Sequence, residues 1–584
     1  MSALSLSSAN AEYYASNATS NDLILKSKAS HFLSQAAFGG TVAEIDALAA
    51  RIQAIGHIPA CEEWIDQQLA LPIGTTYLGK VNQMLNSPLG HAYNSNASGD
   101  YWHQAWWDQV INSDDQLRHR MAFALSQICV VSTNYWNNLY RSRFKKHVEY
   151  YDMLMNNAFT SHRDLLHDVT YSPMMGVWLS HAQNAKADPE LGTHPDENYA
   201  REVMQLFSCG VYAQDAYGNI LTDTNGTPIE NYDNDDIVEF AQVFTGLSIN
   251  DQRGFFSKNL TLLGNGPMSM HQQYHDESEK HLLNGVVLPA GQPGNTDIAM
   301  ALDNLADHPS TAPYFSRLLI QRFTSSNPSN DYVKRVTDAW YGNGPFGTGV
   351  SGDFKAVLKA ILLDTEARDA INYVKQKSGR NYIVRANPVD ELSGKIKEPL
   401  LKLAQFYRFA GATSDYEDGI IRLTLSDRAY GQAVLSANSV FNFYDAGHAP
   451  SHGPIGDYVA AFEAANPGLS IELTAPEAQI LGQNAVGEFE QFYNIPFTGP
   501  NAYIKNDISV LTQLPTIQLM HDGHFSFTKG LIRYIDVYLC HGQLPYSLAQ
   551  SIENDLQGSA DTWEEQVAQI VSVIFTSPAA SVAN

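Results

Sequence analysis

A cluster of charged side chains lies in the segment THPDENYAREVMQLFSCG, residues 193–210. If this segment is helical, Glu197 and Arg201 lie four residues apart on one face, and Glu202 lies on the adjacent face. Two neighbouring carboxylates can do general acid–base chemistry when burial raises the pKa of one of them. The alternative interpretation is an ion-pair network that ties helices together, because such networks also shift pKa values.

A second polar cluster is HQQYHDESEK, residues 271–280. Here His275 and Asp276 could act as a base and its orienting acid, or as a pair of metal ligands. His271 and His275 have the spacing of helical zinc ligands, but the sequence has no HExxH pattern. The alternative is a solvated polar loop.

Hard oxygen donors in these two clusters could hold a divalent cation. The cysteines predict neither a zinc ribbon nor a disulfide framework, because they are far apart and form no CxxC pair. We therefore expect four free thiols, at Cys61, Cys129, Cys209 and Cys540.

Helical periodicity dominates the 584 residues that must position these side chains. Residues 114–132, DDQLRHRMAFALSQICVVS, are apolar around most of the circumference, which predicts a helix buried on all sides. Between Val211 and Pro293, turn residues predict a small β-hairpin and then a long loop. Residues 429–501 suggest an irregular, aromatic-rich segment, and we expect helices over 387–410 and 548–575.

The predicted fold class is mainly α: one large multi-helix globular body with a small β-hairpin insertion and long aromatic-rich loops. We expect residues 1–22 to form a flexible lead-in and residues 23–584 to form a single domain. Helical periodicity begins at about Ser27.

The charge balance and the lack of long apolar stretches each argue against one class of partner. Lys and Arg number 36 and Asp and Glu 62, for a net charge of −26. A chain this acidic repels phosphate backbones, so we expect no nucleic acid partner. No stretch approaches the roughly 20 apolar residues that span a bilayer, so we expect no membrane span.

Many segments, in order along nearly the whole chain, resemble the bacterial "domain of unknown function 1800" family. They are SHFLSQAAFGGTVAEI, LRHRMAFALSQICVVS, YYDMLMNNAFTSHRDLLHDVTYSPMMGVWLS, PDENYAREVMQLFSCGVY, DDIVEFAQVFTG, YHDESEK, HPSTAPYFSRLLIQRF, SANSVFNFYDAG and APEAQIL.

The resemblance implies a largely helical protein exported to the periplasm or the cell exterior, with its leader absent from this chain. The alternative is a cytoplasmic protein. The family-like polar motif is PDENYARE, carried by Glu197, Arg201 and Glu202 together with their neighbours, and the later loop supplies His275 and Asp276. The chain departs from the family pattern at residues 160–162, Thr-Ser-His.

These observations predict a hydrolase or lyase that acts on a polar polymer, such as a polysaccharide or peptide, or on its fragments. Glu197 and Glu202 would be its acid–base candidates, and Arg201 would clamp an anionic group. His275 and Asp276 would complete the site, which requires both segments to meet in a hydrated hollow. The alternative is a non-catalytic cell-surface binding or assembly protein.

Overall fold

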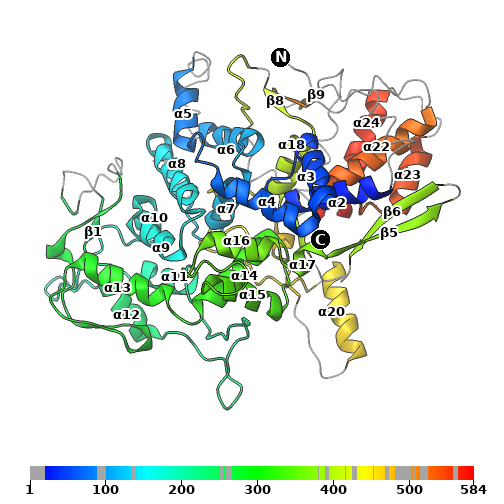
Figure 1. Ribbon diagram of the computed structural model, residues 1–584. Helices are drawn as coiled ribbons and strands as arrows, with labels where there is room; N and C mark the ends of the chain where they lie inside the picture. Colours follow the sequence, from blue (N-terminus) through cyan, green and yellow to red (C-terminus); the bar gives the residue numbers. More distant parts are fainter. Residues whose placement is uncertain are drawn as a thin grey trace.

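The computed structural model of the chain describes residues 20–87, 100–133, 140–249, 254–256, 266–378, 381–388, 394–414, 416–423, 431–451, 453–466, 473–480, 502–504, 507–512, 524–556 and 563–583. Helices dominate these residues, and the strands form only small antiparallel sheets (Figure 1). The prediction of a mainly α protein is therefore confirmed.

The first part of the chain supplies eleven of the 22 α-helices in the described residues. They are α2 (Ser20–Ala36), α3 (Val42–Ile55), α4 (His57–Ala70), α5 (Tyr77–Asn86), α6 (Asp100–Asn112), α7 (Gln116–Ser126), α8 (Tyr140–Asn157), α9 (His162–Tyr171), α10 (Pro173–Trp178), α11 (Asn198–Gln205) and α12 (Asn234–Val243).

Further helices follow at α13 (Gly294–Ala306), α14 (Thr311–Phe323), α15 (Asn330–Trp340), α16 (Phe354–Leu362), α17 (Thr365–Arg368), α18 (Pro399–Phe409), α20 (Gly453–Ala465), α22 (His524–Leu539), α23 (Tyr546–Leu556), α24 (Trp563–Thr576) and α25 (Pro578–Ser581). The antiparallel pairs are β1 (Leu247–Ser248) with β2 (Ser269–Met270), β3 (Lys280–His281) with β4 (Val287–Leu288), β5 (Ile371–Ser378) with β6 (Asn381–Pro388), and β7 (Lys395–Ile396) with β11 (Val582–Ala583). A three-stranded sheet joins β8 (Thr413–Ser414), β10 (Asp507–Thr512) and β9 (Ala502–Ile504) in that order.

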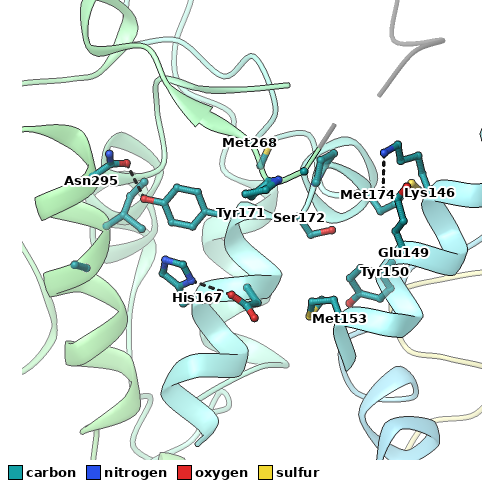
Figure 2. A pocket seen from close by; sticks show the side chains of 16 residues that line it. Lys146, Glu149, Tyr150, Met153, His167, Tyr171, Ser172, Met174, Met268 and Asn295 are labelled. Carbon is teal, nitrogen blue, oxygen red and sulfur yellow. Dashed lines mark hydrogen bonds and ion pairs between the residues drawn. The ribbon is translucent and has the colours of Figure 1, made fainter. Parts of the chain in front are cut away.

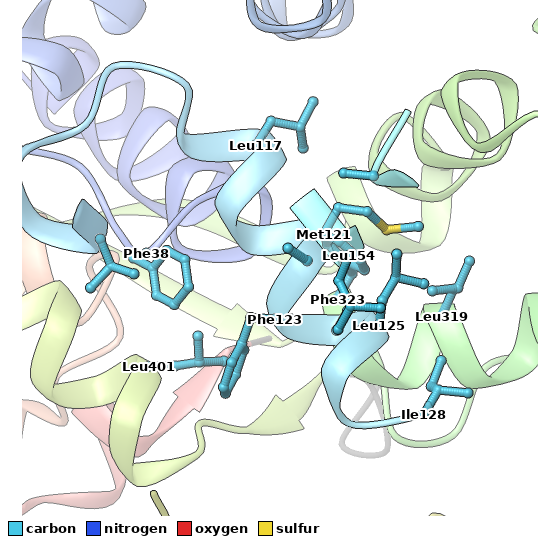
Figure 3. Close-up of a cluster of buried hydrophobic side chains, with 14 of the residues drawn as sticks. Phe38, Leu117, Met121, Phe123, Leu125, Ile128, Leu154, Leu319, Phe323 and Leu401 are labelled. Atoms are coloured by element: carbon cyan, nitrogen blue, oxygen red, sulfur yellow. The ribbon is translucent and has the colours of Figure 1, made fainter. Parts of the chain in front are cut away.

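Helix α7 lies at the centre of the core, as its apolar circumference predicts. Every residue from Gln116 to Ser126 is buried. Side chains from distant parts of the sequence pack around it, among them Phe38, Leu319 of α14 and Leu401 of α18 (Figure 3). Packing on all sides, rather than along one stripe, lets this helix organise the others.

The predicted hairpin lies at residues 211–231, where isolated β-bridges join Tyr212 to Glu230, Gln214 to Ile220 and Thr222 to Pro228. Its two turns place Gly218 and Gly226 at φ of 74° and 84°, a conformation that favours glycine. The prediction of a hairpin is therefore confirmed, although it consists of single bridges.

Several predicted boundaries are wrong. Helix α2 begins at Ser20, inside the predicted lead-in, and residues 1–19 lie outside the described part. The segment 429–501, predicted to be mostly irregular, contains one α-helix, α20, among its described residues. Strand β6 occupies the start of the range expected to be helical at 387–410, and α18 begins only at Pro399. The helix expected at 548–575 is instead two helices, α23 and α24.

A buried lysine makes the stability of the C-terminal region depend on pH. The Lys402 ammonium group donates to the Ser581 hydroxyl at 2.6 Å and lies 4.6 Å from the centroid of the Phe575 ring. Burial, helped by the charge of Lys397, lowers the pKa of Lys402 to about 7. Between that value and the ordinary lysine pKa of roughly 10.4, the unfolded chain binds a proton that the folded chain lacks. The contribution of Lys402 to the free energy of unfolding therefore rises with pH across this window.

We expect Lys402→Met to remove up to about 1.4 kcal/mol per pH unit from that rise, because methionine fills similar space without a charge. Urea unfolding at pH 7, 8, 9 and 10 measures the slope, with the exposed Lys355→Met as the control. Parallel slopes for Lys402→Met and wild type would show that this lysine does not titrate on unfolding.

Candidate functional site

The acidic helix turn near residue 200 lies partly on the protein surface. Helix α11 begins at Asn198, with Glu197 at its N-cap. The carboxylate of Glu197 pairs with the guanidinium of Arg201 at 3.3 Å, and their side chains are 46% and 41% exposed. A pair this exposed contributes at most about 1 kcal/mol to stability. Glu197 and Arg201 are therefore accessible to solvent and to partners.

Glu202 has a different environment, because it turns inward from the same helix. Glu202 is buried, and its Oε2 atom has no hydrogen-bond partner among the described residues. Burial raises the pKa of Glu202 above its ordinary value, against the opposing effect of Arg201. Of the two predicted acid–base carboxylates, Glu202 is the one with the environment of a proton donor.

His275 is completely buried, at 0% exposure. Its Nε2 atom lies 3.1 Å from the Asp297 carboxylate, and its Nδ1 atom lies 3.0 Å from the carbonyl oxygen of Thr245. Both ring nitrogens are therefore engaged within the protein. In this arrangement the imidazole joins elements together and does not face solvent.

The carboxylate of Asp297, on α13, is the centre of what we call the Asp297 network. It accepts hydrogen bonds from Lys280 at 2.8 Å and from Gln292 at 2.8 Å, in addition to its contact with His275. The Lys280 ammonium group also donates to the carbonyl oxygens of Asp276 and Ser278. The network therefore attaches the loop before α13 to that helix.

Asp276, predicted to orient His275, has another role. Its carboxylate accepts hydrogen bonds from the backbone and hydroxyl of Ser278, and its own backbone N–H donates to the Thr245 hydroxyl. The carboxylate that contacts the ring of His275 belongs instead to Asp297. Sequence adjacency of His275 and Asp276 thus points to the wrong acid.

A short loop connects the two predicted clusters. The Asn184 side chain forms two hydrogen bonds with the backbone of Asp196, just before α11. The backbone N–H of Lys186 donates to the carbonyl oxygen of Tyr274 at 2.8 Å, next to His275. The segments are therefore tied to one loop, but the buried ring of His275 faces no hydrated hollow.

A pocket of about 700 Å³ lies elsewhere, between α8, residues 167–174, residues 266–268 and α13 (Figure 2). We call it the α9 pocket. Its apolar lining includes Met153, Met174, Met268 and Ile298, and methionines suit a site that adapts to its ligand. None of the five predicted site residues lines this pocket.

Hydrogen-bonding groups of the α9 pocket occupy opposite sides of its apolar lining (Figure 2). On one side the Tyr171 hydroxyl donates to Asn295 at 2.8 Å, and the His167 ring lies 3.0 Å from the Asp168 carboxylate. On the other, Lys146 pairs with Glu149 at 2.6 Å. The pocket therefore offers donors and acceptors around an apolar centre, the usual composition of a small-molecule site.

Local sequence explains how these side chains reach the α9 pocket. Ser161 caps α9, and the helix buries one stripe that includes Leu165, Leu166 and Val169. His167 and Asp168 lie off that stripe, so His167 is exposed and Asp168 is partly exposed. A polar His-Asp dipeptide off the apolar face of a helix was the signal that sequence reasoning missed.

The four thiols and the hypothesis of a metal site have different outcomes. All four cysteines are free and buried. Within the described residues, no group of three or more His, Cys, Asp or Glu side chains is arranged to hold a metal ion.

A family model described as "Protein of unknown function (DUF1800)" matches residues 31–582. The chain belongs to the DUF1800 family. No curated protein and no solved structure matches the chain. The α9 pocket and α11 both lie within the DUF1800 match. Among the described residues, no helix of this DUF1800 protein is long and apolar enough to cross a membrane.

Proposed function

We propose that the protein binds a neutral, hydroxyl-rich molecule, such as a polysaccharide end or fragment, in the α9 pocket. The observation that carries this proposal is the composition of the pocket. Hydroxyl groups both donate and accept, so they can pair with the Glu149 carboxylate as well as with the Asn295 amide. The ring of Tyr171 supplies an aromatic surface for the apolar face of a sugar.

The charge of the α9 pocket favours a neutral ligand over an anionic one. Lys146 contributes one positive charge, whereas Glu149 and Asp168 contribute two negative charges. The hydrogen bond from His167 lowers the pKa of Asp168, which keeps that carboxylate ionised. A ligand with its own carboxylates would therefore meet repulsion.

Isothermal titration with cellotetraose, chitotetraose and tetragalacturonate tests the proposal. We expect at least one neutral tetrasaccharide to bind at least ten-fold more tightly than tetragalacturonate. The physical reason is the excess of carboxylates in the pocket, so lower ionic strength should widen the difference. Preference for the uronate, or binding of none of the three, would contradict the proposal.

We also propose export to the periplasm or the cell exterior. Support comes from the resemblance in sequence and from a composition with 17% charged and 11% aromatic residues. Fractionation of the producing cells with cytoplasmic and periplasmic marker enzymes tests this proposal. Recovery with the cytoplasmic marker would contradict it.

A hydrolase or lyase centred on α11 is the second candidate, and the environment of Glu202 is the observation that favours it. A buried carboxyl group with a raised pKa can donate a proton to a leaving group. In this candidate Glu197 and Arg201 would contact the substrate at the surface, and the buried His275 would act only by holding the fold.

For this second candidate we expect Glu202→Gln to keep the fold and to lower turnover at least 100-fold, because glutamine cannot donate that proton. Release of reducing ends from the same oligosaccharides measures turnover, and circular dichroism checks the fold. Glu190→Gln is the control, since it changes an exposed carboxylate outside α11 and should leave turnover at the wild-type level. Wild-type turnover in Glu202→Gln would exclude Glu202 as the acid.

A further inference from the structure

The α9 pocket holds an imidazole that a chain of hydrogen bonds orients. The Thr160 hydroxyl donates to Asn157 at 2.9 Å, and the Asn157 amide donates to the Asp168 carboxylate at 2.8 Å. The other oxygen of Asp168 lies 3.0 Å from Nδ1 of His167. Asn157 is itself buried and also donates to the carbonyl oxygen of Met153. The carboxylate beside His167 is therefore fixed from the preceding helix.

This arrangement sets the tautomer of His167. An ionised carboxylate only accepts hydrogen bonds, so Nδ1 carries the proton and Nε2 carries the free lone pair. In Figure 2 the second ring nitrogen of His167 points away from the carboxylate that holds the first. A base held by an acid in this way is the recurring arrangement of general-base catalysis, in which the orienting carboxylate stays ionised.

We propose that His167 is a general base that activates water to remove short ester-linked acyl groups from the hydroxyl-rich ligand of the α9 pocket. This inference rests on the proposed binding function. The mixed composition of the pocket selects the substrate class. Met153, Met174 and Met268 can cover a short acyl chain, while the polar groups bind the hydroxylated part.

The reaction needs no reagent other than water. Nε2 of His167 accepts a proton from water as the water oxygen forms a bond to the ester carbonyl carbon. The tetrahedral intermediate then expels the alcohol oxygen, which takes the proton from the His167 imidazolium. The products are a carboxylic acid and the free hydroxyl of the ligand.

Cleavage of a glycosidic bond in the same pocket fits the groups less well. It requires a protonated carboxylic acid near the leaving oxygen. Asp168 is held ionised by His167, and Glu149 is paired with Lys146. The alcohol of an ester leaves from the tetrahedral intermediate more easily than the alcohol of a glycoside leaves from the sugar carbon. The His167 imidazole, first as base and then as imidazolium, therefore suffices for ester hydrolysis.

Hydrolysis of p-nitrophenyl acetate, p-nitrophenyl butyrate and acetylated xylotetraose by the full-length protein tests the inference. We expect His167→Gln to lower kcat/KM at least 100-fold, within the range of about 10² to 10⁴ for general-base catalysis. Asp168 is a positioning residue, so Asp168→Asn should lower kcat at least ten-fold with little change in KM. Added imidazole should restore His167→Ala but not Asp168→Asn.

His281→Gln is the matched control. His281 is also exposed and also pairs with an acidic neighbour, Glu279 at 3.4 Å, but it lies outside the α9 pocket. It should retain the wild-type rate. Absence of hydrolysis by the wild type, or equal rates in wild type and His167→Gln, would overturn the inference. If oligosaccharides still bind in that case, only the esterase inference fails; if they do not, the binding proposal fails as well.

Discussion

Replacing Ala299 with tryptophan should weaken ligand binding to the α9 pocket at least 100-fold. Ala299 lines the pocket from α13 and is only partly buried, so a larger side chain can extend into the open volume. An indole there would occupy the space of a sugar ring and cover Ile298. We expect at least a 100-fold rise in Kd, which corresponds to about 2.7 kcal/mol. Isothermal titration with the tightest-binding tetrasaccharide measures it.

Thr296→Trp is the control for this substitution. Thr296 lies on the same helix, is exposed, and does not line the pocket. It should leave Kd within about two-fold of wild type, and both variants should retain the wild-type circular dichroism spectrum. Equal affinity of Ala299→Trp and wild type would show that the ligand binds elsewhere.

Loss of the Asp297 carboxylate should destabilise the fold more than any other single change considered above. Asp297→Ala leaves the buried ammonium group of Lys280 without its counter-charge and removes a partner from His275 and Gln292. Removal of one partner from a buried ion pair costs about 3–5 kcal/mol. Urea unfolding at neutral pH should therefore show a large fall in the transition midpoint.

Asp303→Ala provides the comparison within α13. Asp303 pairs with Arg163, but its side chain is 61% exposed, so its loss should cost at most about 1 kcal/mol. The double variant Asp297→Ala/Lys280→Met should recover part of the lost stability, because it removes the uncompensated charge. Equal midpoints for Asp297→Ala and Asp303→Ala would contradict the account of the Asp297 network.

Periodicity and turn chemistry predict those parts of the fold that depend on local sequence. The buried circumference of α7 follows from its apolar pattern, and the hairpin at 211–231 follows from its glycine turns. The β5–β6 hairpin was missed because only six of the sixteen strand residues are of the β-prone types Ile, Tyr and Val. Helix α20 was missed because two glycines and a proline in its first turn obscure the helical pattern.

The candidate site was harder to predict because it depends on contacts between distant residues. No local pattern predicts which carboxylate contacts the ring of His275. It belongs to Asp297, 22 residues further along the chain, and not to the adjacent Asp276. The orientation of His167 likewise depends on Asn157, which belongs to the preceding helix. Spacing along one element reveals which side chains share a face, but not which partner arrives from another element.

A crystal structure of the protein with its tightest-binding tetrasaccharide tests the central claim most directly. The account predicts a sugar ring in the α9 pocket, in contact with Tyr171 and Asn295. A sugar bound instead beside Glu202 on α11, with the α9 pocket empty, would contradict it.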